Sequence, residues 1–207
     1  MGNPTAITVA GPAGNLDGVL TRAGHESGRA AVLCHPHPQF GGSMHDAVLD
    51  AVERVLLAEG VHCVRFDFRG VGNSAGRFDG GNGETDDALA VLDCVRDHLP
   101  DVRETWLAGY SFGAHVAWRA AQATDDVARV LLVAPPFGRM DFASARPDLP
   151  VHVIGGDADA FIDWDALTHW CDARGPATTV ARLPGVDHFF RTGGNALTAA
   201  LRAAAQG

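Results

Sequence analysis

The feature that most restricts the fold of this chain is its alternation of short apolar runs with segments of helical periodicity. Most of the apolar runs are continuous, as in strands that are buried on both faces of a sheet. We expect strands at 30–34, 61–66, 104–110, 128–134, 150–155 and 178–183. We expect helices at 43–58, 84–99, 164–173 and 196–204, and a further helix that follows the strand at 104–110 and runs through residue 123. This alternation predicts a mostly parallel α/β sheet with helices on both faces.

The N-terminal segment has a different pattern. Two short apolar runs, Ile7–Val9 and Leu16–Leu20, flank the turn sequence Gly11-Pro12-Ala13-Gly14-Asn15, which predicts an antiparallel hairpin. With the six later strands, the expected sheet has eight. We find no repeat or linker and expect a single domain over 1–207. The irregular stretch 137–149 is too short for a helical cap domain.

Composition excludes several kinds of partner. The net charge is −9 and the chain has no basic run, which argues against nucleic acid. No apolar run is long enough to span a membrane, and no signal peptide is visible. The four cysteines are far apart, which favours free thiols in a reducing cytoplasm. We therefore expect a cytoplasmic protein without a membrane partner, either a monomer or a homodimer.

The sequence Gly109-Tyr110-Ser111-Phe112-Gly113 has the form G-x-S-x-G, and it lies between an apolar strand and a helical segment. A sharp strand-to-helix turn of this kind strains its central residue, and the two glycines leave room for it. The Ser111 hydroxyl would then stand above the sheet at a helix N-terminus, where N–H groups can stabilise an oxyanion. Alternatively, Ser111 is an ordinary N-cap of a core helix.

A serine nucleophile requires a base and a group that orients the base. His188 follows the last predicted strand, and Asp157 and Asp159 follow the strand at 150–155. Because ligands bind at the carboxyl ends of parallel strands, these groups are expected at one edge of the sheet. Either aspartate could accept the Nδ1–H of His188. The alternative for His188 is a surface or N-cap histidine.

Five segments together resemble the α/β-hydrolase superfamily, and within it the small lidless hydrolases similar to dienelactone hydrolases and short-chain carboxylesterases. They are Leu33-Cys34-His35-Pro36-His37-Pro38-Gln39-Phe40-Gly41-Gly42, Asp67-Phe68-Arg69-Gly70-Val71-Gly72-Asn73-Ser74, Gly109-Tyr110-Ser111-Phe112-Gly113, Gly156-Asp157-Ala158-Asp159 and Asp187-His188. The resemblance spans nearly the whole chain and implies an α/β-hydrolase fold without a cap domain. Family members usually carry G-x-x-D after this strand, which implies Asp159 as the acid, with Asp157 as the alternative.

The resemblance also implies an oxyanion hole made of two backbone N–H groups. One belongs to Phe112, the residue after the nucleophile. Many relatives have His-Gly before the second donor, whereas this chain has His35-Pro36-His37. Since proline lacks an N–H, the alignment assigns the second donor to His37.

Other residues allow more than one interpretation. His35, His37 and His45 suggest a metal, but their spacing is not that of a metal motif, and we expect neither a metal nor another cofactor. The Gly70-Val71-Gly72 sequence lacks the full nucleotide-binding pattern and favours a tight turn. An acyl pocket could be lined by five side chains that could equally belong to the core: Phe40, Met44, Tyr110, Phe137 and Phe161.

These observations predict a serine hydrolase that cleaves small or short-acyl carboxylic esters through an acyl-enzyme on Ser111. The expected partner is a small-molecule ester or thioester. Two kinds of alternative remain. The first is a thioesterase, peptidase or acyltransferase that uses the same three residues. The second is a protein that keeps the fold but binds a ligand without catalysis.

Overall fold

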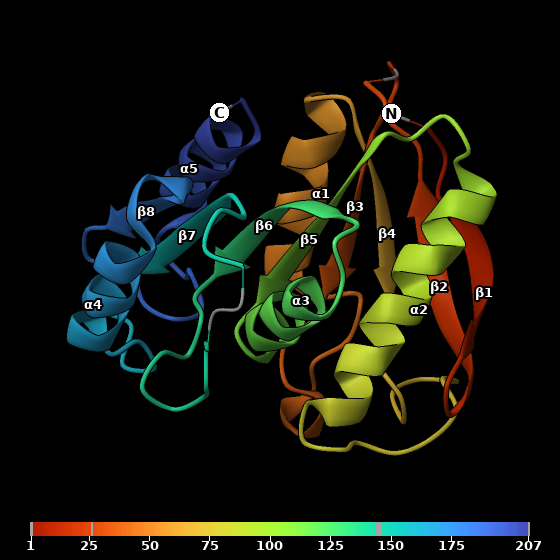
Figure 1. Ribbon diagram of the computed structural model, residues 1–207, viewed down its shortest axis with the longest axis horizontal. Helices are drawn as coiled ribbons and strands as arrows, with labels where there is room; N and C mark the ends of the chain where they lie inside the picture. The colour runs from red at the N-terminus through yellow and green to blue at the C-terminus, as the bar shows by residue number, and fades with distance from the viewer. Residues whose placement is uncertain (1, 26, 144–145, 207) are drawn as a thin grey trace.

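The computed structural model describes residues 2–25, 27–143 and 146–206, and Figure 1 traces its strands and helices. Within these residues, eight strands form one sheet in the order β1-β2-β4-β3-β5-β6-β7-β8. The strands are β1 (Thr5–Gly11), β2 (Gly14–Thr21), β3 (Arg29–Cys34), β4 (Val61–Phe66), β5 (Glu104–Tyr110), β6 (Val127–Val133), β7 (Val151–Gly156) and β8 (Thr178–Leu183). The helices are α1 (Ala47–Ala58), α2 (Asn82–His98), α3 (Phe112–Ala123), α4 (Trp164–Arg174) and α5 (Gly194–Gln206), with short 3-10 turns η1 (Pro38–Phe40) and η2 (Gly175–Ala177).

The strand pairing confirms the predicted mostly parallel sheet with an antiparallel hairpin at its N-terminal end. β1 pairs with β2, and β2 with β4, in antiparallel register, and the other neighbouring strands are parallel. Cys34 at the end of β3 lies beside Gly109 near the end of β5. The carboxyl ends of β3, β5, β6, β7 and β8 therefore lie along one edge of the sheet.

The helices cover both faces of the sheet, as predicted. α1 and α5 lie on one side and α2 and α3 on the other (Figure 1). Side chains along β3 alternate between the two layers: Val32 packs on the side of α2 and α3, and Leu33 on the side of α1 and α5. Both faces of the central strands are thus buried, which is why their sequences are continuously apolar.

The helix predicted to begin at residue 43 begins later, at Ala47. The Asp46 side chain accepts hydrogen bonds from the N–H groups of Val48, at 2.8 Å, and Leu49, and so caps the helix. The N–H of Met44 donates to Asp67 Oδ1 at 2.8 Å. This long-range contact holds the preceding residues against the loop after β4, so they do not join the helix.

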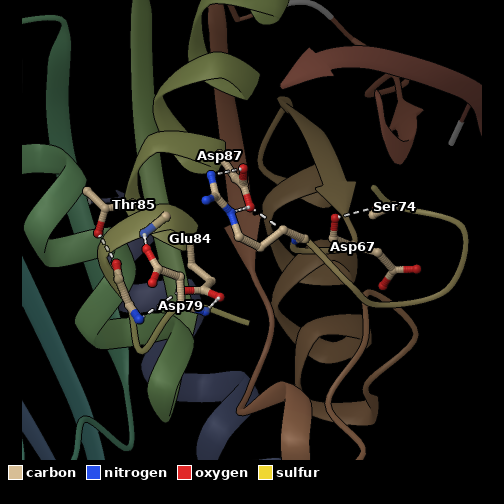
Figure 2. Close-up of polar contacts among 9 residues, drawn as sticks. Asp67, Ser74, Asp79, Glu84, Thr85 and Asp87 are labelled. Carbon is tan, nitrogen blue, oxygen red and sulfur yellow. Dashed lines mark hydrogen bonds and ion pairs between the residues drawn. The ribbon is translucent and has the colours of Figure 1, made fainter. Parts of the chain in front are cut away.

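The loop after β4 is fixed to α2 by a network of carboxylates, which Figure 2 shows. Arg69 pairs with the fully buried Asp87 at 2.7 Å, and the fully buried Glu84 accepts from the N–H groups of Asp79 and Gly81. Gly70 N–H donates to Ser74 O at 3.2 Å, which closes the tight turn predicted there. Phe68 in the same loop lies against Phe112, the residue after Ser111, with ring centroids 6.0 Å apart.

Residues 134–150 connect β6 to β7 without a helix among their described residues, as expected for a fold without a cap domain. Three side chains fasten this connection to the body of the molecule. Trp118 Nε1 donates to Ala143 O at 2.8 Å, Trp170 Nε1 to Phe142 O at 2.7 Å, and Arg174 to Leu149 O at 2.6 Å. None of the helices in the described residues is both long and apolar enough to cross a bilayer.

Candidate active site

Ser111 occupies a strained turn between β5 and α3. Its φ of 55° and ψ of −119° lie outside the regions that side-chain-bearing residues usually adopt. Its N–H donates to Val133 O at 2.9 Å, which ties the turn to β6. A Cβ on Gly109 would overlap Gly113 O, and a Cβ on Gly113 would overlap Cys34 O. The turn therefore depends on both glycines, as the sequence predicts.

Ser111 does not act as an ordinary N-cap, because its side chain makes no capping hydrogen bond to α3. Its Oγ lies 3.0 Å from His188 Nε2 instead. Phe112 is the first residue of α3, and the helix has no internal acceptor for the N–H of that position. An N–H that the helix does not use thus lies next to the serine, at the positive end of the helix dipole.

His188 connects Ser111 to Asp159. His188 Nδ1 lies 2.7 Å from Asp159 Oδ2, and both side chains are buried, with 6% of His188 and 4% of Asp159 exposed. The second oxygen of Asp159 accepts from the N–H of Phe161 at 2.7 Å. The Tyr110 hydroxyl donates to His188 O at 3.0 Å, which holds the histidine backbone over the end of β5.

The structure brings Asp159, and not Asp157, to the imidazole. Asp157 is exposed, and its Oδ1 accepts from the N–H of Gly185 at 2.6 Å. Its own N–H donates to Leu183 O at 3.0 Å. Asp157 therefore fastens the turn after β8, the turn that leads to His188.

The loop after β3 is held by His35, whose ring is fully buried. His35 Nδ1 donates to Pro36 O at 2.7 Å, and Nε2 accepts from the N–H of Phe68 at 3.0 Å. Burial lowers the pKa of His35 to about 4, against the opposing effect of the Pro36 carbonyl. The ring is therefore neutral at neutral pH and acts as a structural clamp between the loops after β3 and β4.

His37 lies beside the turn that carries Ser111. Its ring centroid is 4.9 Å from that of Phe112 and 4.8 Å from that of Phe40, and its Nδ1 accepts from the N–H of Gln39. The two residues that the resemblance assigns to the oxyanion hole are thus in contact through their rings. Among the described residues, no group of three or more His, Cys, Asp or Glu side chains is arranged to hold a metal ion.

The five predicted pocket residues lie in different environments. Phe161 is 40% exposed, and its ring centroid is 4.4 Å from that of His188, while Phe40 is 86% exposed beside His37. Met44 and Tyr110 are buried, and the Tyr110 ring lies 5.5 Å from the His188 ring. Phe137 stacks on Phe142 at 4.1 Å, which places it in the core rather than at the mouth of the site.

Phe189 is a residue of the site that the sequence patterns do not single out. Its side chain is 53% exposed, and its ring centroid lies 5.3 Å from that of His188. The signal was its position directly after the histidine. Phe40 ends η1, Phe161 follows β7 and Phe189 follows β8, and we call these three exposed side chains the aromatic rim.

Comparison with known proteins gives consistent matches. The model of the alpha/beta hydrolase family matches residues 31–205. A crystal structure of a serine hydrolase without a lid from Xanthomonas campestris is 39% identical, with a TM-score of 0.91 over 99% of this chain and 94% of that chain. A serine hydrolase homologue from Coxiella burnetii is 34% identical, with a TM-score of 0.89 over 98% and 97% of the two chains. An uncharacterized protein of Rickettsia prowazekii is 30% identical over 190 residues, which are 87% of this chain and 80% of that protein.

Proposed function

The chain belongs to the alpha/beta hydrolase family, and from this premise we propose that it is a serine hydrolase that cleaves small or short-acyl carboxylic esters through an acyl-enzyme on Ser111. One observation carries the proposal. Ser111 Oγ, the His188 ring and the Asp159 carboxylate form a continuous series of contacts of 3.0 and 2.7 Å. The relative from Xanthomonas campestris, described as a serine hydrolase without a lid, adds support.

In the first half of the reaction, Ser111 Oγ attacks the ester carbonyl carbon while His188 Nε2 takes the hydroxyl proton. Asp159 accepts the Nδ1–H, fixes the tautomer and stabilises the imidazolium. The N–H groups of Phe112 and His37 bind the oxyanion. When the tetrahedral intermediate collapses, the C–O bond to the alcohol breaks and His188 returns the proton to the departing alkoxide.

In the second half, water repeats the attack on the acyl carbon. His188 Nε2 takes a proton from the water, and the resulting intermediate collapses with release of the carboxylic acid. The proton passes back to Ser111 Oγ, so the enzyme returns to its starting state. These steps require no group beyond the residues named here.

The expected preference for small or short acyl groups follows from the surroundings of the serine. The connection between β6 and β7 has no helix among its described residues, and its fastening to Trp118 and Trp170 keeps it against the body of the protein. Long acyl chains would therefore gain little buried area. Within the aromatic rim, Phe161 and Phe189 lie beside His188 and offer apolar contacts close to the reacting carbonyl.

The test is hydrolysis of p-nitrophenyl esters from acetate to decanoate by the wild type and by Ser111→Ala. We expect activity that is highest on short chains and is lost in the variant, whose fold is checked by its urea unfolding curve. Activity retained by a folded Ser111→Ala would contradict the proposed nucleophile. Matched thioester and amide substrates distinguish an esterase from a thioesterase or peptidase.

A further inference from the structure

A groove of about 600 Å³ lies between α3 and the segment that follows β6. Met140 supplies an apolar side chain above the fully buried Trp118, and Arg119 and Arg139 supply two guanidinium groups. None of these residues belongs to the proposed catalytic machinery. The proposed catalytic mechanism therefore gives the groove no role.

Phe161 lies between a residue of the groove and the proposed active site. The Arg139 guanidinium carbon lies 5.0 Å from the centroid of the Phe161 ring, which lies 4.4 Å from the His188 ring. Arg139 also donates to Ala160 O at 3.1 Å, next to Asp159. From the other side, His115 lies one helical turn beyond Ser111, and its N–H donates to Ser111 O at 3.4 Å. Residues of the groove thus lie next to both sides of the proposed active site.

The charge of the groove is opposite to that of the whole chain, which carries −9. Within the described part of the chain, neither Arg119 nor Arg139 forms an ion pair. Arg119 donates to the neutral Asn82 side chain at 2.9 Å. The one acidic lining residue, Asp141, accepts from the N–H of Ala143 at 2.9 Å. The two guanidinium groups are thus available to an external anion.

His115 adds a polar group to the groove without adding charge. Its side chain is buried, and its Nδ1 has no hydrogen-bond partner among the described residues. Burial and the nearby Arg119 lower the pKa of His115 to about 4, against an opposing effect of the Asp141 backbone. At neutral pH the ring is therefore neutral and suited to hydrogen bonding rather than ion pairing.

We propose that this groove binds a carboxylate group at the far end of the substrate, so that the preferred substrates are esters whose acyl chain ends in a second, ionised acid. Arg139, which contacts the Phe161 ring beside His188, makes the main contact, and Arg119 the second. A guanidinium pairs with a carboxylate through two parallel hydrogen bonds, which favours this anion. The inference rests on the proposed function, because it assigns the substrate class of the same site.

The experiment compares p-nitrophenyl monoesters of adipic and suberic acid with the uncharged hexanoate and octanoate of equal chain length. The quantity measured is the ratio of kcat/KM for the charged ester to that for the uncharged ester. We expect a ratio above one for the wild type, reduced about tenfold by Arg139→Gln and less by Arg119→Gln. Arg139→Lys should restore part of it. Arg54→Gln, an exposed arginine on α1, is the matched control and should leave the ratio unchanged.

A ratio that neither Arg139→Gln nor Arg119→Gln changes would overturn the proposal. Titration calorimetry with adipate gives a readout that does not depend on turnover. We expect the wild type to bind adipate and Arg139→Gln to bind it more weakly, with both affinities falling at high salt. If the protein hydrolyses no ester but binds adipate in this way, the proposed function fails and the anion site stands. No binding by the wild type contradicts the site.

Discussion

The interior of the candidate site and its rim are built on different principles. In the interior, Ser111, His188 and Asp159 are linked by hydrogen bonds, and the glycines beside Ser111 have no room for a side chain. At the aromatic rim, large apolar side chains are between 40% and 86% exposed. The comparison indicates that the interior fixes the chemistry, while the rim and the neighbouring groove can vary and thereby set the choice of substrate.

The largest expected effect concerns the acid in the interior. Asp159→Asn should lower kcat/KM for short esters by about 10⁴-fold, because the amide cannot hold His188 in the required tautomer. Asp157→Asn is the matched change in the same turn and should cost less than about tenfold, since the Asp157 carboxylate accepts a hydrogen bond from the backbone N–H of Gly185 and not from His188. Equal losses in the two variants would show that the choice between the two aspartates is wrong.

The next effect tests the lack of space beside Ser111. Gly113→Ala should lower the free energy of unfolding by about 3 kcal/mol or more, because its Cβ would overlap a backbone oxygen that cannot rotate away. Gly194→Ala is the control, since a Cβ there meets nothing within 4 Å, and should change stability by less than about 0.5 kcal/mol. Both values come from urea unfolding. A Gly113→Ala variant as stable as the wild type would contradict the close approach of β3 and α3.

A third prediction concerns the His35 clamp behind the loop after β3. Because its pKa falls from 6.5 to about 4 in the folded protein, the unfolded chain binds more protons between these two values. His35 therefore contributes stability that is present above pH 6.5 and is lost as the pH falls toward 4, by roughly 2–3 kcal/mol. Urea unfolding at pH 7 and pH 4.5 measures the loss, which should be smaller in His35→Gln. The same loss in both proteins would mean that His35 titrates normally.

The smallest expected effect is on stability, and it is tested with one aromatic side chain from the interior and one from the rim. Phe112 and Phe40 both contact the His37 ring, but Phe112 is buried and Phe40 is exposed. Phe112→Leu should lower the free energy of unfolding by about 1 kcal/mol, whereas Phe40→Leu should leave it unchanged within about 0.5 kcal/mol. A larger loss of stability in Phe40→Leu than in Phe112→Leu would contradict the distinction between interior and rim.

The sequence predicted the parts of the fold that depend on local patterns. Continuous apolar runs identified the buried strands, and the spacing of Gly109 and Gly113 identified the strained turn, because each pattern reflects a steric requirement of neighbouring residues. The start of α1 was misplaced because it depends on the contact of Met44 with Asp67, on a different element. No local pattern reports such a contact.

Within the site, the family resemblance predicted Asp159 as the acid. The structural role of Asp157 follows only from its hydrogen bond with the N–H of Gly185. The groove was not predicted at all. Arg119 lies on α3 and Arg139 in the segment after β6, and neither sequence neighbourhood is unusually basic. The groove forms where α3 packs beside the segment after β6, and no sequence pattern predicts that the two arginines lie in one groove.

The proposed function depends most directly on Ser111 being an activated nucleophile. Treatment with a fluorophosphonate, followed by mass spectrometry of the intact protein and its peptides, measures this without a choice of substrate. We expect one adduct on Ser111 in the wild type, and much slower labelling in His188→Ala because the base is missing. The absence of an adduct, or an adduct on another residue, would contradict the assignment of Ser111 as the nucleophile.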